Sequence, residues 1–186
     1  MRIVAGDLRG RPIQAPEGQE VRPTSDRARE AIFNILEHAS WSQGTRDLRA
    51  IDLFAGSGAM GLEALSRGAA ACLFVELAEA SLVAIRANIR AFALEPRTRM
   101  LRQDATRLSR LPELDAPYEL AFLDPPYAKG LAEPALAALK DGGWLAAEAL
   151  VVLERGSGEA PIEPPGFEIL DQRRYGKAEV LFLRPT

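Results

Sequence analysis

The apolar positions of the chain fall into short runs that alternate with segments of helical periodicity. The runs cover residues 50–55, 71–75, 99–101, 120–123 and 149–153. Short runs of this kind are typical of strands buried on both faces, as in the middle of a parallel sheet. Two further stretches, residues 167–175 and 178–183, are split at Gly176-Lys177 and predict an antiparallel pair at one edge of the sheet.

Amphipathic segments between these runs predict helices. We expect helices at residues 25–39, 59–67, 78–92 and 132–139, the first with N-cap candidates at Thr24, Ser25 and Asp26. Apolar residues at helical spacing define two buried faces: Ala28, Ile32, Ile35 and Ala39 in the first helix, and Leu82, Ile85, Ile89 and Phe92 in the third. Gly/Pro-rich residues 155–166 predict a loop too short for a full helix. The alternation of elements predicts an α/β, Rossmann-like fold.

The first 23 residues stand apart from this alternation. Arg2–Gly6 and Arg11–Ile13 flank Asp7–Gly10 and predict a hairpin, and a linker is then expected from Pro16, Gly18 and Pro23. The segment is locally basic through Arg2, Arg9, Arg11 and Arg22. We therefore expect an N-terminal basic arm at 1–23 and one main domain at 24–186. A phosphate-touching arm and a solvated extension both remain open.

Composition limits the classes of function. At 186 residues and 47% hydrophobic, the chain can bury one full core. It has no run of about 18 apolar residues and no signal-peptide pattern, so we expect a cytoplasmic protein without membrane contact. Cys72 and His38 are the only residues of their types, which leaves little material for disulfides, zinc clusters or catalytic triads. The net charge of −3 lacks the basic excess usual in nucleic-acid binding.

Candidate cofactor chemistry follows the run at 50–55. Gly56-Ser57-Gly58-Ala59-Met60-Gly61 joins that strand to a helix, which is the context of the Gly-x-Gly-x-x-Gly fingerprint. Glycines let a ligand approach the backbone, and the helix N-terminus offers unpaired N–H groups. Glu76 ends the next strand, where an acid commonly accepts hydrogen bonds from ribose hydroxyls. Dehydrogenases, flavoproteins and methyltransferases share this fingerprint.

A more specific motif, Asp124-Pro125-Pro126-Tyr127, follows the run at 120–123. The prolines end the strand, so Asp124 stands at its carboxyl end, where open α/β sheets bind ligands. The carboxylate and the rigid carbonyls form a fixed cluster of acceptors, and Tyr127 adds an aromatic face. We expect this group to hold a flat base by its amine and to stabilise positive charge that develops on that nitrogen. The ring of Tyr127 would hold the base by stacking.

These motifs, together with Glu76 and Asp104, occur in the order and spacing of class I S-adenosylmethionine-dependent amino-methyltransferases. Over nearly its whole length the chain resembles the bacterial small-subunit (16S) ribosomal RNA guanine-N2 methyltransferase family. The resemblance also covers Arg2–Gly6, Arg9–Arg11, Arg22–Asn34, Gly61–Ala69 and Tyr175-Gly176. The chain departs from the family pattern at Lys177-Ala178, where a pair of small or hydroxyl residues is expected.

The resemblance implies a seven-stranded mixed sheet with helices on both faces and an antiparallel edge strand. It implies S-adenosylmethionine as cofactor, and as partner ribosomal RNA, within a small ribosomal subunit or an assembly intermediate, for a monomeric enzyme. The implied cofactor-binding residues are Asp52, Phe54, Gly56, Gly58, Glu76 and Asp104, and the implied catalytic residues are Asp124, Pro125 and Tyr127.

The resemblance also implies individual roles. Gly56 and Gly58 would pass under the methionine part of the cofactor, with Asp52 near its amino group. Glu76 would take the ribose hydroxyls and Asp104 the adenine amine. Asp124 and the Pro125 carbonyl would hold the guanine amine while Tyr127 stacks on the base. The methyl group would pass in line from sulfonium to nitrogen, with no metal and no covalent intermediate.

Three alternatives remain open. An NAD-dependent oxidoreductase shares the glycine loop, but Asp-Pro-Pro-Tyr has no role in hydride transfer. An adenine-N6 nucleic-acid methyltransferase shares the Asp-Pro-Pro-Tyr chemistry, but usually carries a target-recognition domain for which this chain has no room. The third is a non-catalytic RNA-binding module. Guanine is favoured as target because its N1–H and N2–H edge offers two donors to a carboxylate that only accepts.

Overall fold

The computed structural model describes residues 1–17 and 25–186. Along the chain the elements are α1 (Asp26–His38), β1 (Arg49–Leu53), α2 (Ala59–Ser66), β2 (Ala71–Glu76), α3 (Glu79–Ala91), η1 (Glu95–Arg97), β3 (Thr98–Arg102), η2 (Ala105–Arg107), β4 (Tyr118–Leu123), α4 (Ala132–Asp141), β5 (Leu145–Gly156), β6 (Phe167–Tyr175) and β7 (Ala178–Pro185), where η marks a short 3-10 helix. None of the helices within the described ranges is long and apolar enough to cross a membrane.

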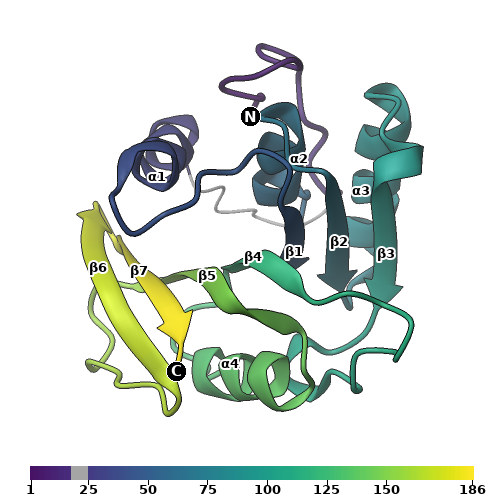
Figure 1. Cartoon of the computed structure of the whole chain (residues 1–186). Helices are drawn as coiled ribbons and strands as arrows, with labels where there is room; N and C mark the ends of the chain where they lie inside the picture. Colours follow the sequence, from purple (N-terminus) through teal and green to yellow (C-terminus); the bar gives the residue numbers. More distant parts are fainter. Residues whose placement is uncertain (18–24) are drawn as a thin grey trace.

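The strands form one seven-stranded mixed sheet in the order β3-β2-β1-β4-β5-β7-β6 (Figure 1). Neighbours among β1 to β5 pair in parallel, whereas β7 pairs antiparallel with both β5 and β6. The predicted fold class and the predicted antiparallel pair are thereby confirmed. The strand that runs against the others is β7, one position inside the edge, and β6 forms the edge. Apolar Val180–Leu183 suits the buried interior position, and the mostly exposed β6 suits an edge.

Helices cover both faces of the sheet. Figure 1 shows α1, α2 and α3 on one side and α4 on the other, and two apolar cores lie between these layers and the strands. Side chains alternate between the cores along each strand: Phe122 faces the three-helix side, and Leu123 faces α4. By the same alternation Asp52 faces the three-helix side, because Ile51 and Leu53 both belong to the α4 core.

The buried face of α1 differs from the predicted stripe. Ala28 and Ile32 are buried as expected, but Phe33 and Leu36 complete the face, and Ile35 is only half-buried. Arg29 is also fully buried, because it pairs with Glu63 of α2. Ser25 is the N-cap, since its side chain accepts a hydrogen bond from the Ala28 amide at 3.1 Å, whereas Thr24 lies outside the described residues. No helix forms in residues 157–166, as predicted.

The described part of the N-terminal arm, residues 1–17, packs against the domain. Its hairpin is reduced to one antiparallel bridge between Arg2 and Pro12. Ile3 is fully buried in the three-helix core, and the Val4 and Ala5 amides donate to the buried Glu63 carboxylate at 2.8 and 3.0 Å. The arm therefore shares the core of the domain. The predicted linker residues Gly18 and Pro23 and the basic residue Arg22 lie outside the described residues, so the boundary at 23/24 stays a prediction.

Candidate active site

Most of the predicted site residues lie together at the carboxyl ends of the central parallel strands. Leu53 of β1 pairs in register with Val75 of β2 and with Leu123 of β4, and Leu123 pairs with Leu153 of β5. An acidic residue directly follows Val75, Leu123 and Leu153: these acids are Glu76, Asp124 and Glu154. The sheet thus aligns three carboxyl side chains beside the loop that leaves β1.

The glycine loop after β1 adopts an unusual backbone. Phe54, Gly56 and Gly58 have φ values of 56°, 55° and 80°, a region that costs a non-glycine residue about 1–3 kcal/mol. A Cβ atom on Gly56 would meet nothing nearer than the Phe54 carbonyl oxygen at 3.9 Å, so Gly56 borders open space. A Cβ atom on Gly58 would lie 3.2 Å from Phe74 and 3.4 Å from Ile85. An added side chain at Gly58 would therefore point into the core, whereas one at Gly56 would point into open space.

Asp52 is the buried carboxyl group beneath this loop. It is 3% exposed, and its Oδ2 accepts a hydrogen bond from the Gly61 amide at the start of α2 (2.9 Å). Burial raises the pKa of Asp52 to about 8, the Gly61 hydrogen bond opposes this rise, and the nearby Glu76 carboxylate adds to it. Gly61 itself is required by packing, because a Cβ atom there would lie 2.5 Å from Phe74. A cation bound near Asp52 would therefore favour the ionised, negatively charged form of its carboxyl group.

Glu76 holds the glycine loop to the end of β2. Its Oε2 accepts from the Gly56 amide at 2.9 Å, and its Oε1 accepts from the Leu77 and Ala78 amides at 2.7 and 2.9 Å. A carboxylate offers about four acceptor positions, so about one remains for a ribose hydroxyl. The motif did not indicate this second, loop-fixing role of the residue.

Asp104 follows β3 and caps η2. Its Oδ1 accepts from the Thr106 amide (2.9 Å) and hydroxyl (2.7 Å). These two hydrogen bonds lower the pKa of Asp104 below its ordinary value. The half-exposed carboxylate is therefore ionised at neutral pH and can accept from an amine.

Asp124 belongs to a group of three neighbouring carboxyl side chains. Burial, followed by the carboxylates of Glu154 and Asp52, raises the pKa of Asp124 well above its ordinary value. Like charges so close together disfavour ionisation, and a cation among them would reverse the effect. The three carboxyl groups therefore favour the binding of a positively charged ligand.

The loop after Asp124 is tied to the end of β5. Pro125 is buried, and the half-buried Tyr127 donates through its hydroxyl to Glu154 Oε1 at 2.7 Å. The next residue, Ala128, has a φ of 59°, and its amide donates to Glu159 Oε1 at 3.0 Å. Sequence reasoning missed both glutamates. A charged residue directly after apolar 150–153 was the available signal for Glu154.

A further residue that sequence reasoning missed joins the arm to the glycine loop. Asn88 of α3 is 2% exposed, and its Nδ2 donates to the Ser57 carbonyl at 3.1 Å and to the Gln14 carbonyl at 3.0 Å. Its Oδ1 accepts from the Gln14 amide at 2.8 Å. The arm is therefore fastened to the segment predicted to cradle the cofactor, and a change in one can reach the other.

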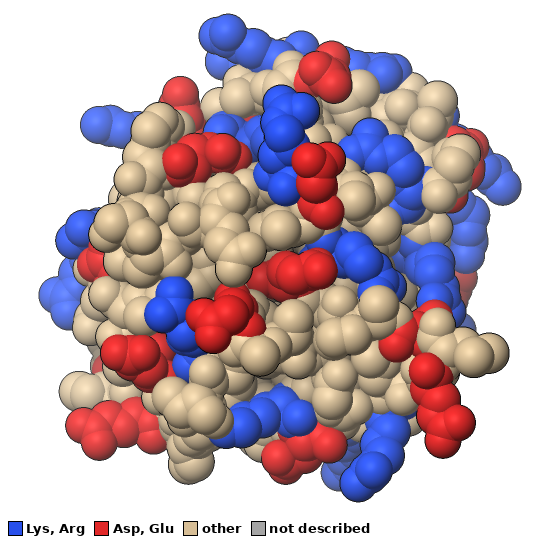
Figure 2. All heavy atoms as spheres, viewed as in Figure 1, with Lys and Arg blue, Asp and Glu red and all other residues tan. Residues whose placement is uncertain are grey.

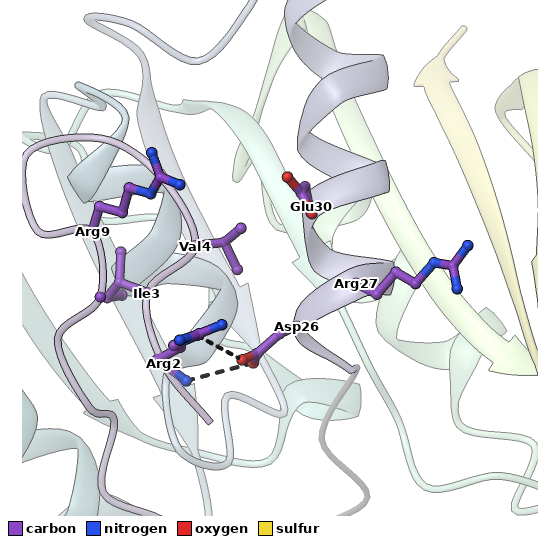
Figure 3. A pocket seen from close by; sticks show the side chains of 8 residues that line it. Arg2, Ile3, Val4, Arg9, Asp26, Arg27 and Glu30 are labelled. Carbon is purple, nitrogen blue, oxygen red and sulfur yellow. Dashed lines mark hydrogen bonds and ion pairs between the residues drawn. The ribbon is translucent and has the colours of Figure 1, made fainter.

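The basic residues of the arm differ in their surroundings. Figure 3 shows Arg2 turned toward Asp26 in a hollow of about 390 Å³ between the arm and α1, with Nε and Oδ2 3.7 Å apart. Arg11 stacks on Phe92 and donates to the Ala91 carbonyl. Arg9 lines the same hollow as Arg2 and is exposed. Arg2 and Arg11 thus have structural contacts, and Arg9 is the described arm residue most available to phosphate.

The surface carries both signs of charge. On the face shown in Figure 2, acidic and basic side chains are interspersed, with basic ones along the top near the arm and on the right near α3 and β3. Several basic residues are committed to ion pairs, such as Arg99 with Asp115 and Arg102 with Glu79, both at 2.9 Å. Acidic neighbours therefore offset part of the positive charge on this surface.

Comparison with known proteins agrees with the fold and the motifs. Residues 1–184 match the family described as Conserved hypothetical protein 95. The ribosomal RNA small subunit methyltransferase D of Escherichia coli K12 is 39% identical over 154 residues, which cover 83% of this chain and 74% of that protein. The protein of the same name from Haemophilus influenzae is 30% identical over 178 residues, covering 95% and 89%. The solved structure of Escherichia coli yhhF has a TM-score of 0.82 and 32% identity, covering 100% and 97%.

Proposed function

The chain belongs to the Conserved hypothetical protein 95 family, that of the ribosomal RNA small subunit methyltransferases D, and on this basis we propose that it methylates the exocyclic N2 amine of a guanine in small-subunit ribosomal RNA. The observation that carries the proposal is the position of Asp124-Pro125-Pro126-Tyr127. It places a group of acceptors at the carboxyl end of β4, directly beside the glycine loop of β1. Two ligands held at these sites would meet at the carboxyl ends of β1 and β4.

The cofactor is S-adenosylmethionine, and the described residues fit it. Gly56 borders open space along the loop, and a ligand ammonium group there would restore the charge of the buried Asp52. Glu76 has about one acceptor position left for ribose, and Asp104 is an ionised acceptor for the adenine amine. When bound, the cofactor supplies an electrophilic methyl group on a sulfonium centre.

The residues of the chain orient the amine that receives this group. The lone pair of a guanine amine is conjugated into the ring, so the amine is a weak nucleophile. Asp124 and the Pro125 carbonyl accept its two hydrogens at fixed positions and favour a more tetrahedral nitrogen. They also stabilise the positive charge that develops there, which is preorganised electrostatic catalysis. The bound cationic cofactor favours the ionised form of Asp124, which can then take the proton that the nitrogen must lose.

Tyr127 and its supports hold the base itself. The ring presents a face for stacking, and Glu154 and Glu159 fix the loop that carries it. A base paired in a helix cannot reach such a site, so the target must be turned out of its stack. Guanine presents N1–H and N2–H as adjacent donors, and the carboxylates of Asp124 and Glu154 lie on adjacent strands at this edge. This match of donors to acceptors supports guanine over adenine.

The test is to identify the methylated atom. Naked small-subunit ribosomal RNA and small ribosomal subunits lacking this modification are incubated with methyl-labelled cofactor, digested, and analysed by mass spectrometry. We expect label as N2-methylguanosine at one position, with the two substrates distinguishing free RNA from an assembled particle. Asp124→Ala is the matched control and should transfer little label. Label on adenine N6, or no label on either RNA substrate, would refute the proposal.

A further inference from the structure

A second hollow lies between the start of α1 and the turn that joins β6 to β7. It measures about 560 Å³ and is lined by Ser25, Arg27, Ala28, Ala31, Tyr175 and Gly176. None of these residues belongs to the cofactor or catalytic set described above. The hollow combines one aromatic ring, one exposed guanidinium group and the small apolar side chains of two alanines.

The hollow lies beside the end of β6 that corresponds to the carboxyl ends of β4 and β5, where the candidate active site lies. β5 and β6 both pair antiparallel with β7, so they run in the same direction, and Tyr175 ends β6 as Gly156 ends β5. The Lys177 carbonyl accepts a hydrogen bond from the Ser157 amide at 2.9 Å. Glu159 accepts from both Gly156 and Ala128, at 3.1 and 3.0 Å. One series of contacts thus connects the turn beside the hollow to the loop that carries Tyr127.

The lining residues have the chemistry of a nucleotide site. The ring of Tyr175 packs on the core from one side and is half-buried. Gly176 has a φ of 61°, and a Cβ atom there would meet nothing within 4 Å, so the turn borders open space. Figure 3 shows Arg27 leaving α1 on the side away from Arg2 and Asp26, toward the C-terminal strands. It forms no ion pair with another residue in the described ranges, and so keeps its charge for a ligand.

We propose that this hollow binds a nucleotide that flanks the target guanine, with its base stacked on Tyr175 and its phosphate paired with Arg27. The inference rests on the proposed function, because it needs a single-stranded RNA segment at the active site. Turning the target out of its stack frees a face of its neighbour, which an aromatic side chain can then cover. An arginine beside the ring supplies the charge that the backbone of such a strand requires.

The experiment measures RNA affinity and single-turnover methyl transfer with a ribosomal RNA fragment that the wild type methylates. Tyr175→Ala should weaken RNA affinity roughly 5- to 100-fold, as loss of one base–aromatic stack does. Tyr175→Phe should keep wild-type affinity, and Tyr175→Leu, which keeps the core packing, should lose it like Ala. Cofactor affinity and the transfer rate at saturating RNA should not change.

Arg27→Ala should act through charge. We expect the slope of log affinity against log salt to fall by about 0.7–0.9, the value for one phosphate contact. Arg110→Ala is the matched control, since this exposed arginine follows η2 on the α4 side and its loss should leave the salt slope unchanged. Tyr175 variants should also leave the slope unchanged.

The outcomes separate this inference from the function on which it rests. Folded Tyr175→Leu and Arg27→Ala proteins with wild-type RNA affinity and salt slope, in an enzyme that still transfers methyl groups, would overturn the flanking-nucleotide site alone. A wild-type protein that transfers no methyl group to RNA would overturn the proposed function, and this inference with it. A normal cofactor affinity in each variant confirms that the variant is folded.

Discussion

The hydroxyl group of Tyr127 donates a 2.7 Å hydrogen bond to Glu154, so the ring expected to stack on the target base is held by the neighbouring strand β5. The motif alone predicts only an aromatic face, for which phenylalanine would serve as well. In the structure the acceptor is a carboxylate that is 8% exposed. Both the loop after β4 and the ionisation of Asp124 depend on this carboxylate.

Tyr127→Phe should therefore be less harmless than the motif indicates. A hydrogen bond to a charged group contributes about 1.5–3 kcal/mol, and this one is partly buried, so we expect a lower free energy of unfolding and a slower single-turnover rate. Urea denaturation and rapid-quench methyl transfer at saturating cofactor measure the two effects. Tyr118→Phe is a suitable control, because Tyr118 is buried at the other end of β4. A Tyr127→Phe protein equal to wild type in both assays would contradict the role of the hydroxyl.

Substitutions at two glycines should separate folding from cofactor binding. A side chain at Gly58 meets Phe74 and Ile85, so Gly58→Val should mainly lower the melting temperature. Gly56→Val places its side chain in the open space beside the loop, where it should abolish cofactor binding in a protein that still folds. Both positions have positive φ and share the backbone penalty, which makes each a control for the other. Calorimetric titration and thermal melts give the two readouts. Tight cofactor binding by Gly56→Val would exclude this side of the loop as the site.

Stability should fall as pH rises through neutrality because of Asp52. Burial raises the pKa of Asp52 from its ordinary value of 3.8 to about 8, so between these values the native state holds a proton that the unfolded state has lost. The free energy of unfolding therefore falls with pH across this window. The stabilisation is fully present below about pH 4 and lost as pH passes 8. Asp52→Asn keeps an acceptor for Gly61 and removes the titration, so its melting temperature should exceed that of wild type at pH 8–9. Parallel curves for the two proteins would show that Asp52 is not protonated in the fold.

Cofactor binding should release protons at neutral pH. The ammonium and sulfonium groups favour the ionised forms of Asp52 and Asp124, whose pKa values are raised in the free protein. Titration calorimetry in buffers of different ionisation enthalpy counts the protons. Asp52→Asn should release fewer of them, and wild-type affinity should rise from pH 6 to pH 8. A heat that is independent of the buffer would contradict this linkage.

The sequence predicts the fold well because the relevant information is local. Apolar runs, glycine punctuation and Ser25 as a cap locate nearly every element to within a few residues. The misses concern long-range contacts. The buried face of α1 includes Arg29 because this residue pairs with Glu63 of α2. The two residues are 34 positions apart in the sequence, so the apolar periodicity of α1 does not indicate the pair. Asn88 and Glu154 likewise act through partners brought close only by the folded sheet.

The candidate site divides in the same way. Residues at a turn or strand end, such as Gly56, Asp104 and Asp124, can be proposed from their place in a motif, and their roles stay predictions. Residues that support them from neighbouring elements cannot be proposed in this way. Gly58 shows a further limit, since the fingerprint does not tell at which glycine an added side chain would enter open space and at which it would enter the core.

The strongest prediction concerns Asp124. If its carboxylate accepts from the target amine, its contribution is greatest in the transition state, when positive charge builds on that nitrogen. Loss of one preorganised electrostatic contact typically lowers turnover by a factor of about 10²–10³. We expect the turnover of Asp124→Ala and of Asp124→Asn to fall by at least that factor. Asn keeps the shape but turns an NH2 group toward the guanine donors. Single-turnover transfer with saturating cofactor isolates the chemical step from binding. A wild-type rate for Asp124→Ala would mean that this residue does not hold the amine, and the amino-methyltransferase mechanism would then need another acceptor.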